Sequence, residues 1–178
     1  MLPKKTITER KPRTKTAEQA LSSLMRLCAR AEKCEADARR LMRGWGVAEQ
    51  EIEPVVARLV RDRFIDDSRY AAMYVREKAN LSGWGAYKIR TFLQRKQIDK
   101  ATIDEALQQI DPARAADRLI ERLQRKARTT KAKSPYELRT KLIRYALSLG
   151  FGYEAVQQAV GALCTADQEE NVCDEFFD

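Results

Sequence analysis

Histidine is absent from the 178 residues of this sequence. Its absence excludes general acid–base catalysis by imidazole, nucleophile pairs that depend on histidine and zinc sites that need an imidazole ligand. The four cysteines include no Cys-x-x-Cys pair, and we interpret them as reduced, partly buried thiols rather than as zinc ligands. They are Cys28, Cys34, Cys164 and Cys173. The sequence therefore predicts no enzyme activity, no metal site and no cofactor.

Turn-forming residues and long apolar runs are also scarce. Seven glycines and five prolines leave little turn punctuation for a many-stranded sheet. The Gly-Trp-Gly turns at 44–46 and 83–85 lack the spacing and the final Lys-Ser/Thr of a phosphate-binding loop. A membrane-spanning helix requires about 18 consecutive apolar residues, and no apolar run comes near this length. The basic segment 1–16 lacks the apolar stretch of a secretory signal. We therefore expect a soluble, cytoplasmic protein that makes no membrane contact.

Apolar residues recur with helical spacing along almost all of the remaining sequence. Ile52, Val55, Val56 and Leu59 follow one such stripe, and several later segments repeat the spacing of one buried helix face. No segment shows the sustained alternation of a strand. The sequence therefore predicts an all-α protein of about nine short helices.

Helix-start signals support this prediction. The predicted caps are Asp66, Asp67, Thr102, Asp111 and Ser134. Thr102 and Ser134 are each followed three residues later by a glutamate, which is the pattern of a capping box. Asp111 and Ser134 each precede a proline, the residue favoured at the first helical position. We expect all five to act as structural caps rather than as catalytic or metal-binding residues.

The sequence matches itself in three successive segments. Residues 38–52 align with residues 89–103 at an offset of 51, and a further offset of 53 extends the match to a third segment. Val47, Ile98 and Phe151 occupy one equivalent position, where we expect each to fill the turn after a middle helix. This register predicts three tandem three-helix repeats that form an elongated, curved array.

The repeats and two charged tails divide the chain into five predicted parts. The repeats are predicted at residues 17–65, 66–111 and 112–164, the third with an insertion near 126–134. The segments at 1–16 and 165–178 are strongly basic and strongly acidic, respectively. We expect both tails to be solvated and disordered.

Basic residues concentrate in the third repeat. Between Arg114 and Arg144 the sequence has eleven basic and three acidic residues, which is too large an excess for ion pairing to neutralise. The spacing of the arginines places several on one helix face, so we predict a surface for phosphates or an acidic protein. The alternative is a solvated face stabilised by ion pairs. The candidate residues are Arg114, Arg118, Arg122, Arg125, Lys126, Arg128, Lys131 and Lys133, with Lys88, Arg95 and Lys96 in the second repeat.

Aromatic residues lie near these basic groups in the sequence. We expect Tyr74 and Phe92 to belong to the core, as is usual in small helical units. Trp84, which lies between two glycines, is open to either a core or a surface interpretation, the latter as a stacking residue for single-stranded bases.

The segment from Arg63 to Ile98 closely resembles the signature of the RecX family of bacterial recombination regulators. The family pattern has an apolar-Asp-Asp turn, an aromatic-Ala helix, a Gly-containing turn, then Lys/Arg-Ile and a Leu-x-x-Lys-x-Ile ending. The corresponding parts here are Phe64-Ile65-Asp66-Asp67, Arg69-Tyr70-Ala71, Gly85, Lys88-Ile89 and Leu93 to Ile98. Gln97 departs from the pattern, because the family usually has glycine there. The resemblance extends over about residues 17–164.

This resemblance implies a fold and a function. The fold would be three tandem three-helix repeats in a curved protein that lies in the helical groove of a RecA–single-stranded-DNA filament. There it would bridge adjacent RecA protomers and lower the filament's ATPase, strand-exchange and co-protease activities, so that it regulates DNA repair, recombination and the SOS response. The resemblance implies no catalytic residue. The expected partners are the RecA filament and single-stranded DNA, with duplex DNA as a weaker ligand, and the expected state is a monomer.

Two other functions are consistent with parts of the sequence. A tandem helix-turn-helix protein could bind DNA without RecA, although the sequence lacks clear paired recognition helices. A nuclease would need clustered carboxylates for a divalent metal. The adjacent acidic pairs at 66–67 and 104–105 are better explained as helix-start residues.

Overall fold

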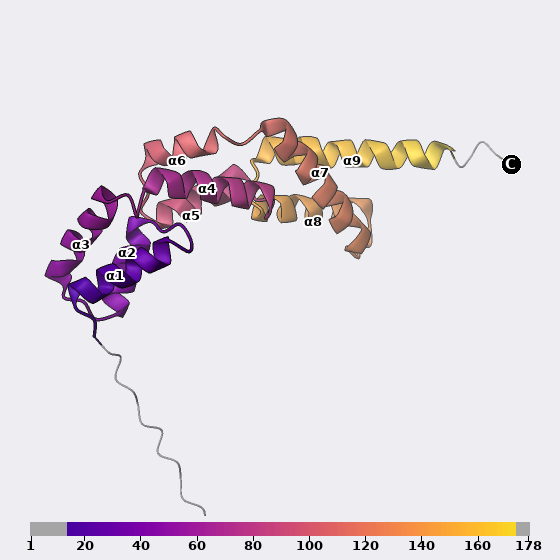
Figure 1. The fold of residues 1–178 in the computed structure, drawn as a ribbon. Coiled ribbons are helices and arrows are strands. Elements are labelled where there is room, and N and C mark those ends of the chain that lie inside the picture. The colour runs from indigo at the N-terminus through magenta and orange to yellow at the C-terminus, as the bar shows by residue number, and fades with distance from the viewer. Residues whose placement is uncertain (1–13, 174–178) are drawn as a thin grey trace, which may run out of the picture. The chain divides into compact units, whose positions relative to one another are not determined.

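The computed structural model describes residues 14–173, with side chains through residue 163 (Figure 1). Within this range the chain forms nine helices and no strand, which confirms the predicted all-α class. The helices are α1 Ala17–Cys28, α2 Glu35–Gly44, α3 Glu49–Arg61, α4 Asp67–Asn80, α5 Ala86–Arg95, α6 Lys100–Leu107, α7 Pro112–Thr129, α8 Pro135–Ser148 and α9 Tyr153–Cys173.

The helices belong to two compact units. The first unit ends at Tyr70 and the second begins at Ala71, so the boundary falls inside α4. In the first unit α1 and α2 both pack against α3. Its core is formed by Ala20, Leu21, Leu24, Ala38, Met42, Val47, Ile52, Val55, Val56, Leu59 and Ile65. Burial of these aliphatic side chains is the main force that holds three short helices together, because each helix alone is too short to be stable.

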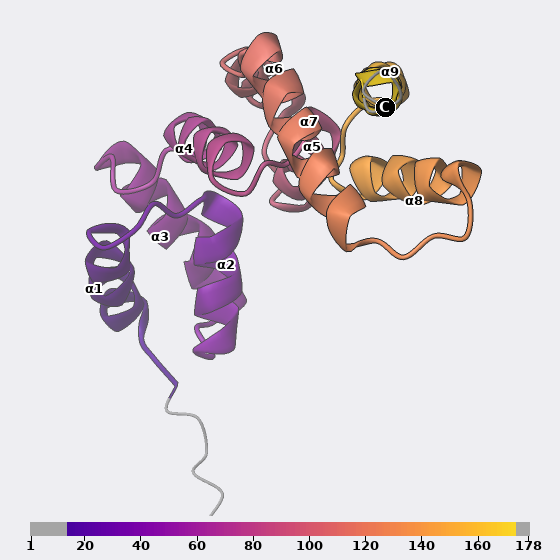
Figure 2. The ribbon, with the colours of Figure 1, turned by 90° about the vertical axis from the view of Figure 1, so that its right-hand side faces the viewer.

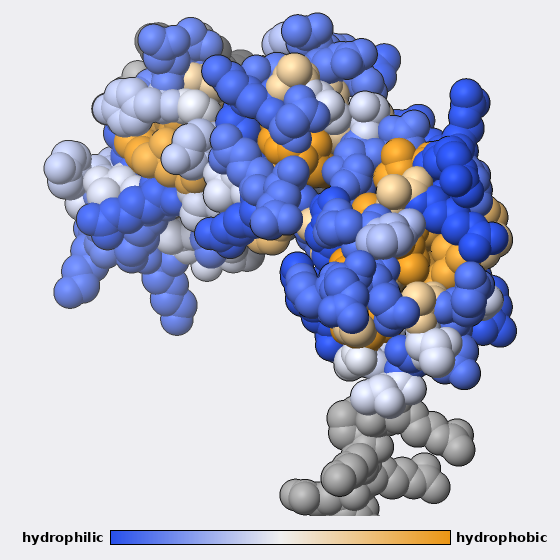
Figure 3. Space-filling model, turned by 90° about the vertical axis from the view of Figure 1, so that its left-hand side faces the viewer, coloured by the Kyte–Doolittle hydropathy of each residue, from blue (hydrophilic) through white to orange (hydrophobic). Residues whose placement is uncertain are grey.

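The second unit contains most of α4 and all of α5 to α9. Helix α5 packs against α6, and α7, α8 and α9 pack against one another. The core of the last three helices consists of Leu119, Leu123, Leu142, Ala146, Val156, Ala159 and Val160. An extended link joins α7 to α8 (Figure 2). Charged and polar side chains cover most of the face in Figure 3, and apolar side chains show only in patches between them.

The three middle helices, α2, α5 and α8, end in the same way. Each is followed by a residue in the left-handed backbone region. This conformation ends the helix, because it directs the amide of the next residue back to a carbonyl group of the last helical turn. These residues are Gly46 at φ 69°, Gln97 at φ 60° and Gly150 at φ 87°. The repeated geometry matches the offsets of the internal sequence repeat.

The residue after each left-handed position closes the turn. The amides of these residues donate to the carbonyl group five residues earlier, at 3.1 Å from Val47 to Met42 and 3.3 Å from Ile98 to Leu93. The third such bond, from Phe151, is 3.5 Å long. Val47 and Ile98 are buried and Phe151 is half-buried. The prediction that these three side chains fill equivalent turns is therefore confirmed, least completely at Phe151.

The paired aspartates before α4 have different roles. The Asp66 carboxylate accepts a 3.0 Å bond from the Arg69 amide and caps α4 as predicted. Asp67 is also a cap, as predicted, but of another helix, because its carboxylate accepts a 3.0 Å bond from the Glu35 amide at the start of α2. Cys34, at the N-cap position of α2, provides no side-chain cap. Asp67 thus caps a helix 32 residues away, and burial raises the pKa of its carboxyl.

The predicted start of the sixth helix is wrong. Helix α6 begins at Lys100, and Asp99 is its N-cap, with its carboxylate accepting a 2.9 Å bond from the Thr102 amide. Thr102 therefore lies in the first turn instead of capping it. Hydrogen bonds from Thr102 hold the pKa of Asp99 below its ordinary value. A carboxylate three residues upstream thus takes the capping role that the sequence pattern assigned to the threonine.

The caps of α7 and α8 agree with prediction. Asp111 accepts bonds from two amides of the first turn of α7, and Ser134 Oγ accepts a 3.2 Å bond from the Glu137 amide. The reciprocal half of the capping box is shifted by one residue, because Glu137 accepts from the Lys133 amide at 2.7 Å.

The predicted tails overlap the ends of the described range. Of the basic segment 1–16, residues 1–13 lie outside that range, whereas Thr16 caps α1 and the Lys15 amide donates to the Trp45 carbonyl at 2.9 Å. The prediction of disorder across 165–178 is wrong for its first part, because α9 continues to Cys173. This stretch contains the helix-favouring residues Ala166, Gln168, Glu169 and Glu170. Residues 174–178 lie outside the described range.

Candidate nucleic-acid interface

Helix α7 places basic residues on one side and a core face on the other. Leu119 and Leu123 are fully buried, and the helix begins at the Asp111 cap with Pro112 in its first turn. The apolar pair fixes how α7 is rotated against α8 and α9, so its arginines face outward. The predicted insertion near 126–134 is partly helical, since α7 runs to Thr129 before the link to α8.

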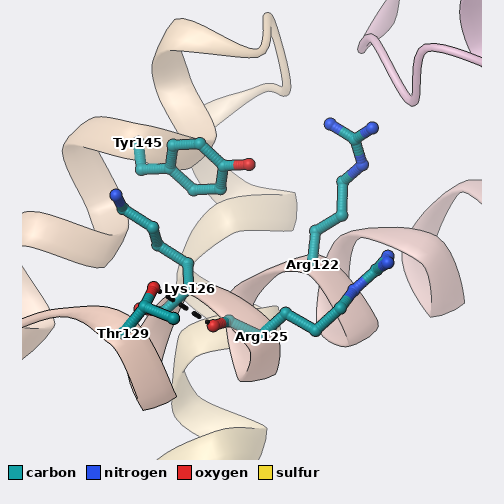
Figure 4. A pocket seen from close by; sticks show the side chains of 5 residues that line it. All are labelled: Arg122, Arg125, Lys126, Thr129 and Tyr145. Atoms are coloured by element: carbon teal, nitrogen blue, oxygen red, sulfur yellow. Dashed lines mark hydrogen bonds between the residues drawn. The ribbon is translucent and has the colours of Figure 1, made fainter.

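Three of the predicted basic residues line one open hollow between α7 and α8. Arg122, Arg125 and Lys126 share it with Thr129 and Tyr145, and its volume is about 320 Å³ (Figure 4). The Lys126 Nζ atom lies 5.5 Å from the centre of the Tyr145 ring. The ring projects from α8 across the space toward the side where Arg122 lies. The hollow therefore combines three cations, the hydroxyl groups of Thr129 and Tyr145, and an aromatic face.

No carboxylate lines this hollow, and none of its three cations forms an ion pair within the part of the chain that the structure describes. Arg125 instead donates from Nε to the Glu121 carbonyl at 3.4 Å. Three unneutralised positive charges around one concave surface focus a positive potential and attract an anion such as a phosphate group.

Gly83 makes room for one of these arginines. It has φ 57°, and a Cβ atom there would lie 2.5 Å from Nε of Arg122. The guanidinium group of Arg122 therefore packs against the backbone of the turn between α4 and α5. A side chain at position 83 would displace Arg122 from the wall of the hollow.

Arg118 has a different environment from its neighbours in the predicted stripe. It donates to the Ala79 carbonyl at 3.3 Å and to Oδ1 of Asn80 at 2.6 Å, at the carboxyl end of α4. A cation at this position satisfies carbonyl groups that the helix leaves without donors. Arg114 lies 3.4 Å from the Asp111 carboxylate. Both arginines line a second, smaller hollow of about 110 Å³, which does not include the three cations above.

The remaining candidates in the third repeat lie toward the link. Arg128, Lys131 and Lys133 are exposed. The link is held by its backbone, because the Lys131 carbonyl accepts from Nζ of Lys141 at 2.7 Å and the Lys133 amide donates to Glu137. Their side chains thus extend the basic surface beyond the hollow without lining it.

The candidates on and after α5 do not line the hollow. Lys88 donates from Nζ to the Ser148 carbonyl at 3.2 Å and lies 4.5 Å above the Trp84 ring. Arg95 is exposed and lies 5.5 Å from the Phe92 ring, and Lys96 is half-buried. The structure therefore separates the predicted basic residues into a hollow on α7 and a second group on α5.

The nearby aromatic residues are intermediate between core and surface. Trp84, Phe92 and Tyr74 are all half-buried, and the Trp84 and Phe92 rings lie 5.1 Å apart. The expected core positions of Phe92 and Tyr74 are thus only partly realised.

The sequence analysis missed three residues of the hollow region. Tyr145 has the helical spacing of the apolar stripe of α8 and packs partly against the core, so the sequence gives no sign that it also lines the hollow. Thr129 and Gly83 carried no distinguishing local pattern. The contact of Gly83 with Arg122 joins residues 39 positions apart, and no spacing rule would have revealed it.

The cysteine and carboxylate side chains in the described part of the chain form no group that could hold a metal ion. Cys28 and Cys34 form no disulfide within the described residues, and the Cys34 thiol donates to the Asp37 carboxylate at 3.3 Å. None of the helices in residues 14–173 is long and apolar enough to cross a membrane.

These features define a class of protein built from three-helix domains, with a basic surface on the last of them. Models of the second and third three-helix domains of RecX match residues 66–107 and 114–160, which correspond closely to α4–α6 and to α7 with its two partners. The chain is 30% identical over 132 residues to regulatory protein RecX of Pseudomonas entomophila, covering 74% of this chain and 83% of that protein. It is 28% identical over 150 residues to regulatory protein RecX of Clostridium beijerinckii, covering 83% and 70%.

A solved structure shows the same fold. The crystal structure of a regulatory protein RecX matches with a TM-score of 0.75 at 24% identity, covering 80% of this chain and 72% of that one. The chain belongs to the RecX family. The predicted family and the all-α fold of three-helix domains are confirmed, and RecX proteins are regulatory proteins rather than enzymes.

Proposed function

We propose that this protein is a monomeric, cytoplasmic regulator that binds the RecA filament on single-stranded DNA. It lies in the helical groove of the filament, bridges adjacent RecA protomers and lowers ATPase, strand-exchange and co-protease activity. The observation that carries this proposal is the match of two RecX domains to the helices that build the basic hollow.

The hollow contributes contacts with phosphate groups. Arginine presents a planar fork of donors that fits phosphate oxygens, and Lys126 adds a third charge beside Arg122 and Arg125. Residues 112–164 contain eleven basic and four acidic residues, so the surroundings of the hollow reinforce its potential. A phosphate-bearing polymer satisfies these cations better than a neutral ligand does.

The test is the ATPase rate of RecA on single-stranded DNA, titrated with this protein at fixed salt. The unmodified protein is expected to lower the rate at substoichiometric amounts. An Arg122→Glu/Arg125→Glu variant should need about tenfold more protein or more, because each reversal replaces an attraction to phosphate by a repulsion. Arg118 is left unchanged, because its contacts with α4 would confound binding with stability.

The matched control is Arg26→Glu/Arg30→Glu in the first unit. Both residues are exposed, and neither forms an ion pair within residues 14–163. This control makes the same change in net charge and should inhibit like the unmodified protein. Helicity by circular dichroism should be the same for both variants.

Three outcomes would contradict the proposal. If the unmodified protein leaves the ATPase rate unchanged, RecA is not the partner. If the ATPase rate is unchanged and the protein still shifts single-stranded or duplex DNA in a gel, it is instead a RecA-independent DNA-binding protein. Equal loss of inhibition in both variants would mean that net charge, rather than the hollow, drives binding.

A further inference from the structure

Two tyrosines lie exposed on either side of one turn of the second unit. Tyr87 near the start of α5 is 73% exposed, and Tyr153 at the start of α9 is 63% exposed. The Tyr87 amide donates to the Gly150 carbonyl at 3.1 Å, and Tyr153 follows Gly150 by three residues. Both tyrosine rings are thus exposed to solvent, and the backbone segments that carry them are joined by a hydrogen bond.

The backbone beneath these rings is tightly held. The Gly85 amide donates to the Leu149 carbonyl at 2.8 Å, and a Cβ atom on Gly85 would overlap the Gly150 carbonyl group. A Cβ atom on Gly150 would in turn overlap Lys88. The start of α5 and the end of α8 are therefore in direct backbone contact. Both tyrosines project from a fixed base, which reduces the entropy lost when a ligand orders them.

The charges around this turn are mostly positive, with one exposed carboxylate, Glu154, next to Tyr153 at the start of α9. Helix α5 contains three basic residues and no acidic residue. In α8 the only acidic residue, Glu137, pairs with Lys141 at 2.8 Å. Arg144 is exposed and forms no ion pair within the side chains that the structure describes. A ligand for this surface must therefore be negatively charged and able to cover aromatic rings.

We infer that Tyr87 and Tyr153 form a stacking platform for the unpaired bases of a single-stranded nucleic acid. Base stacking on exposed aromatic side chains in a basic setting is the physical basis of sequence-tolerant single-strand binding. Lys88 and Arg144 supply the positive charge for the phosphates. Duplex DNA fits less well, because its bases already stack on one another. An acidic protein would satisfy the charges but gives no reason for two exposed rings.

The inference rests on the proposed function only in taking single-stranded DNA as a ligand. Its test is the fluorescence anisotropy of a labelled oligothymidine with the full chain and without RecA. Tyr87→Ala and Tyr153→Ala should each weaken binding by about tenfold, whereas Tyr87→Phe should bind like the unmodified protein, because phenylalanine keeps the ring. The dependence of affinity on salt should not change in the alanine variants, since no phosphate contact is lost.

Tyr136→Ala is the matched control. This tyrosine is 81% exposed in the first turn of α8, eleven residues before Leu147, and lies at the far end of that helix from the turn. Its replacement should leave oligothymidine binding unchanged. Equal losses for all three alanine variants would overturn the inference, because any exposed ring would then serve.

The remaining outcomes separate this inference from the proposed function. If Arg122→Glu/Arg125→Glu loses oligothymidine binding while both alanine variants keep it, the platform is wrong and the phosphate contacts stand. If the alanine variants bind oligothymidine normally but inhibit RecA poorly, the rings contact protein and the platform is again wrong. If the unmodified protein inhibits RecA without binding oligothymidine, the platform fails and inhibition proceeds through RecA alone.

Discussion

The first unit pairs many of its basic residues with carboxylates, whereas the last three helices leave most of theirs without an ion pair among the described side chains. Residues 17–65 contain nine basic and eight acidic residues, against eleven and four in residues 112–164. Arg39 pairs with Glu35 at 2.8 Å and with Glu53 at 2.7 Å, and Arg43 pairs with Glu49 at 2.6 Å. These contacts raise the pKa of Arg39 and lower the pKa of Glu53 and Glu49. The cations of the hollow have no such partners.

The comparison shows that the partner of an arginine, more than its presence, decides what it can bind. A guanidinium group held by two carboxylates offers little charge to a phosphate polymer. Both regions have arginine-rich helices, yet only α7 presents three cations without carboxylates around one concave surface. A different kind of contact joins the second and third three-helix domains, where the start of α5 and the end of α8 touch through glycine backbone.

The largest effect is expected from disturbing that glycine contact. Gly85→Ala places a Cβ atom against the Gly150 carbonyl group, and Gly85 has an ordinary φ of −77°, so the effect reports packing rather than backbone strain. We expect a loss of about 2 kcal/mol or more in the free energy of unfolding and a Tm lower by roughly 5–15 °C. Gly152→Ala is the control, because nothing lies within 4 Å of its Cβ position. Similar melting of both variants in calorimetry would contradict this interpretation of the contact.

A smaller effect of opposite sign is expected at Gln97. The equivalent position in the first unit is Gly46, and both residues have left-handed backbone geometry. Because a left-handed conformation is unfavourable for residues with a Cβ atom, Gln97→Gly should raise the free energy of unfolding by about 0.5–1 kcal/mol. Gln94→Gly, inside α5, should lower it by about 1 kcal/mol. Urea unfolding measures both, and a loss of stability in Gln97→Gly would show that its side chain makes a contact worth more than the strain.

The smallest effect is expected from freeing paired arginines in the first unit. Glu49→Gln/Glu53→Gln removes the partners of Arg43 and one of the two partners of Arg39. Affinity for oligothymidine should rise by about threefold or less, because the freed cations do not line a hollow built for phosphate. A gain as large as the loss in Arg122→Glu/Arg125→Glu would mean that the number of free charges matters and their placement does not.

The sequence predicted those features that depend on local periodicity. The helical class, the three equivalent turns after the middle helices and the caps at Asp66, Asp111 and Ser134 all follow from spacings of a few residues. The capping role of Asp67 was predicted, but the helix that it caps was not, because the amide that it accepts from lies 32 residues away. Thr102 was misassigned because two adjacent capping patterns overlap and only the fold selects one.

The candidate site was predictable in its charge but not in its shape. The helical spacing of α7 identified Arg122, Arg125 and Lys126 as a basic group. It could not separate them from Arg118, whose donors are satisfied by the end of α4. Tyr145 and Gly83 entered the site through packing between α7 and helices distant in the sequence, which no local pattern records.

The contact between α5 and α8 also provides a way to detect separation of the second and third three-helix domains. The Gly85 and Tyr87 amides donate to carbonyls at positions 149 and 150 instead of to their own helix. Their hydrogen–deuterium exchange is therefore slow only while the second and third three-helix domains stay together. Comparing these two amides with the amide of Val47, which is bonded within the first unit, would show whether the domains separate when a filament or a nucleic acid binds, without any label on the protein.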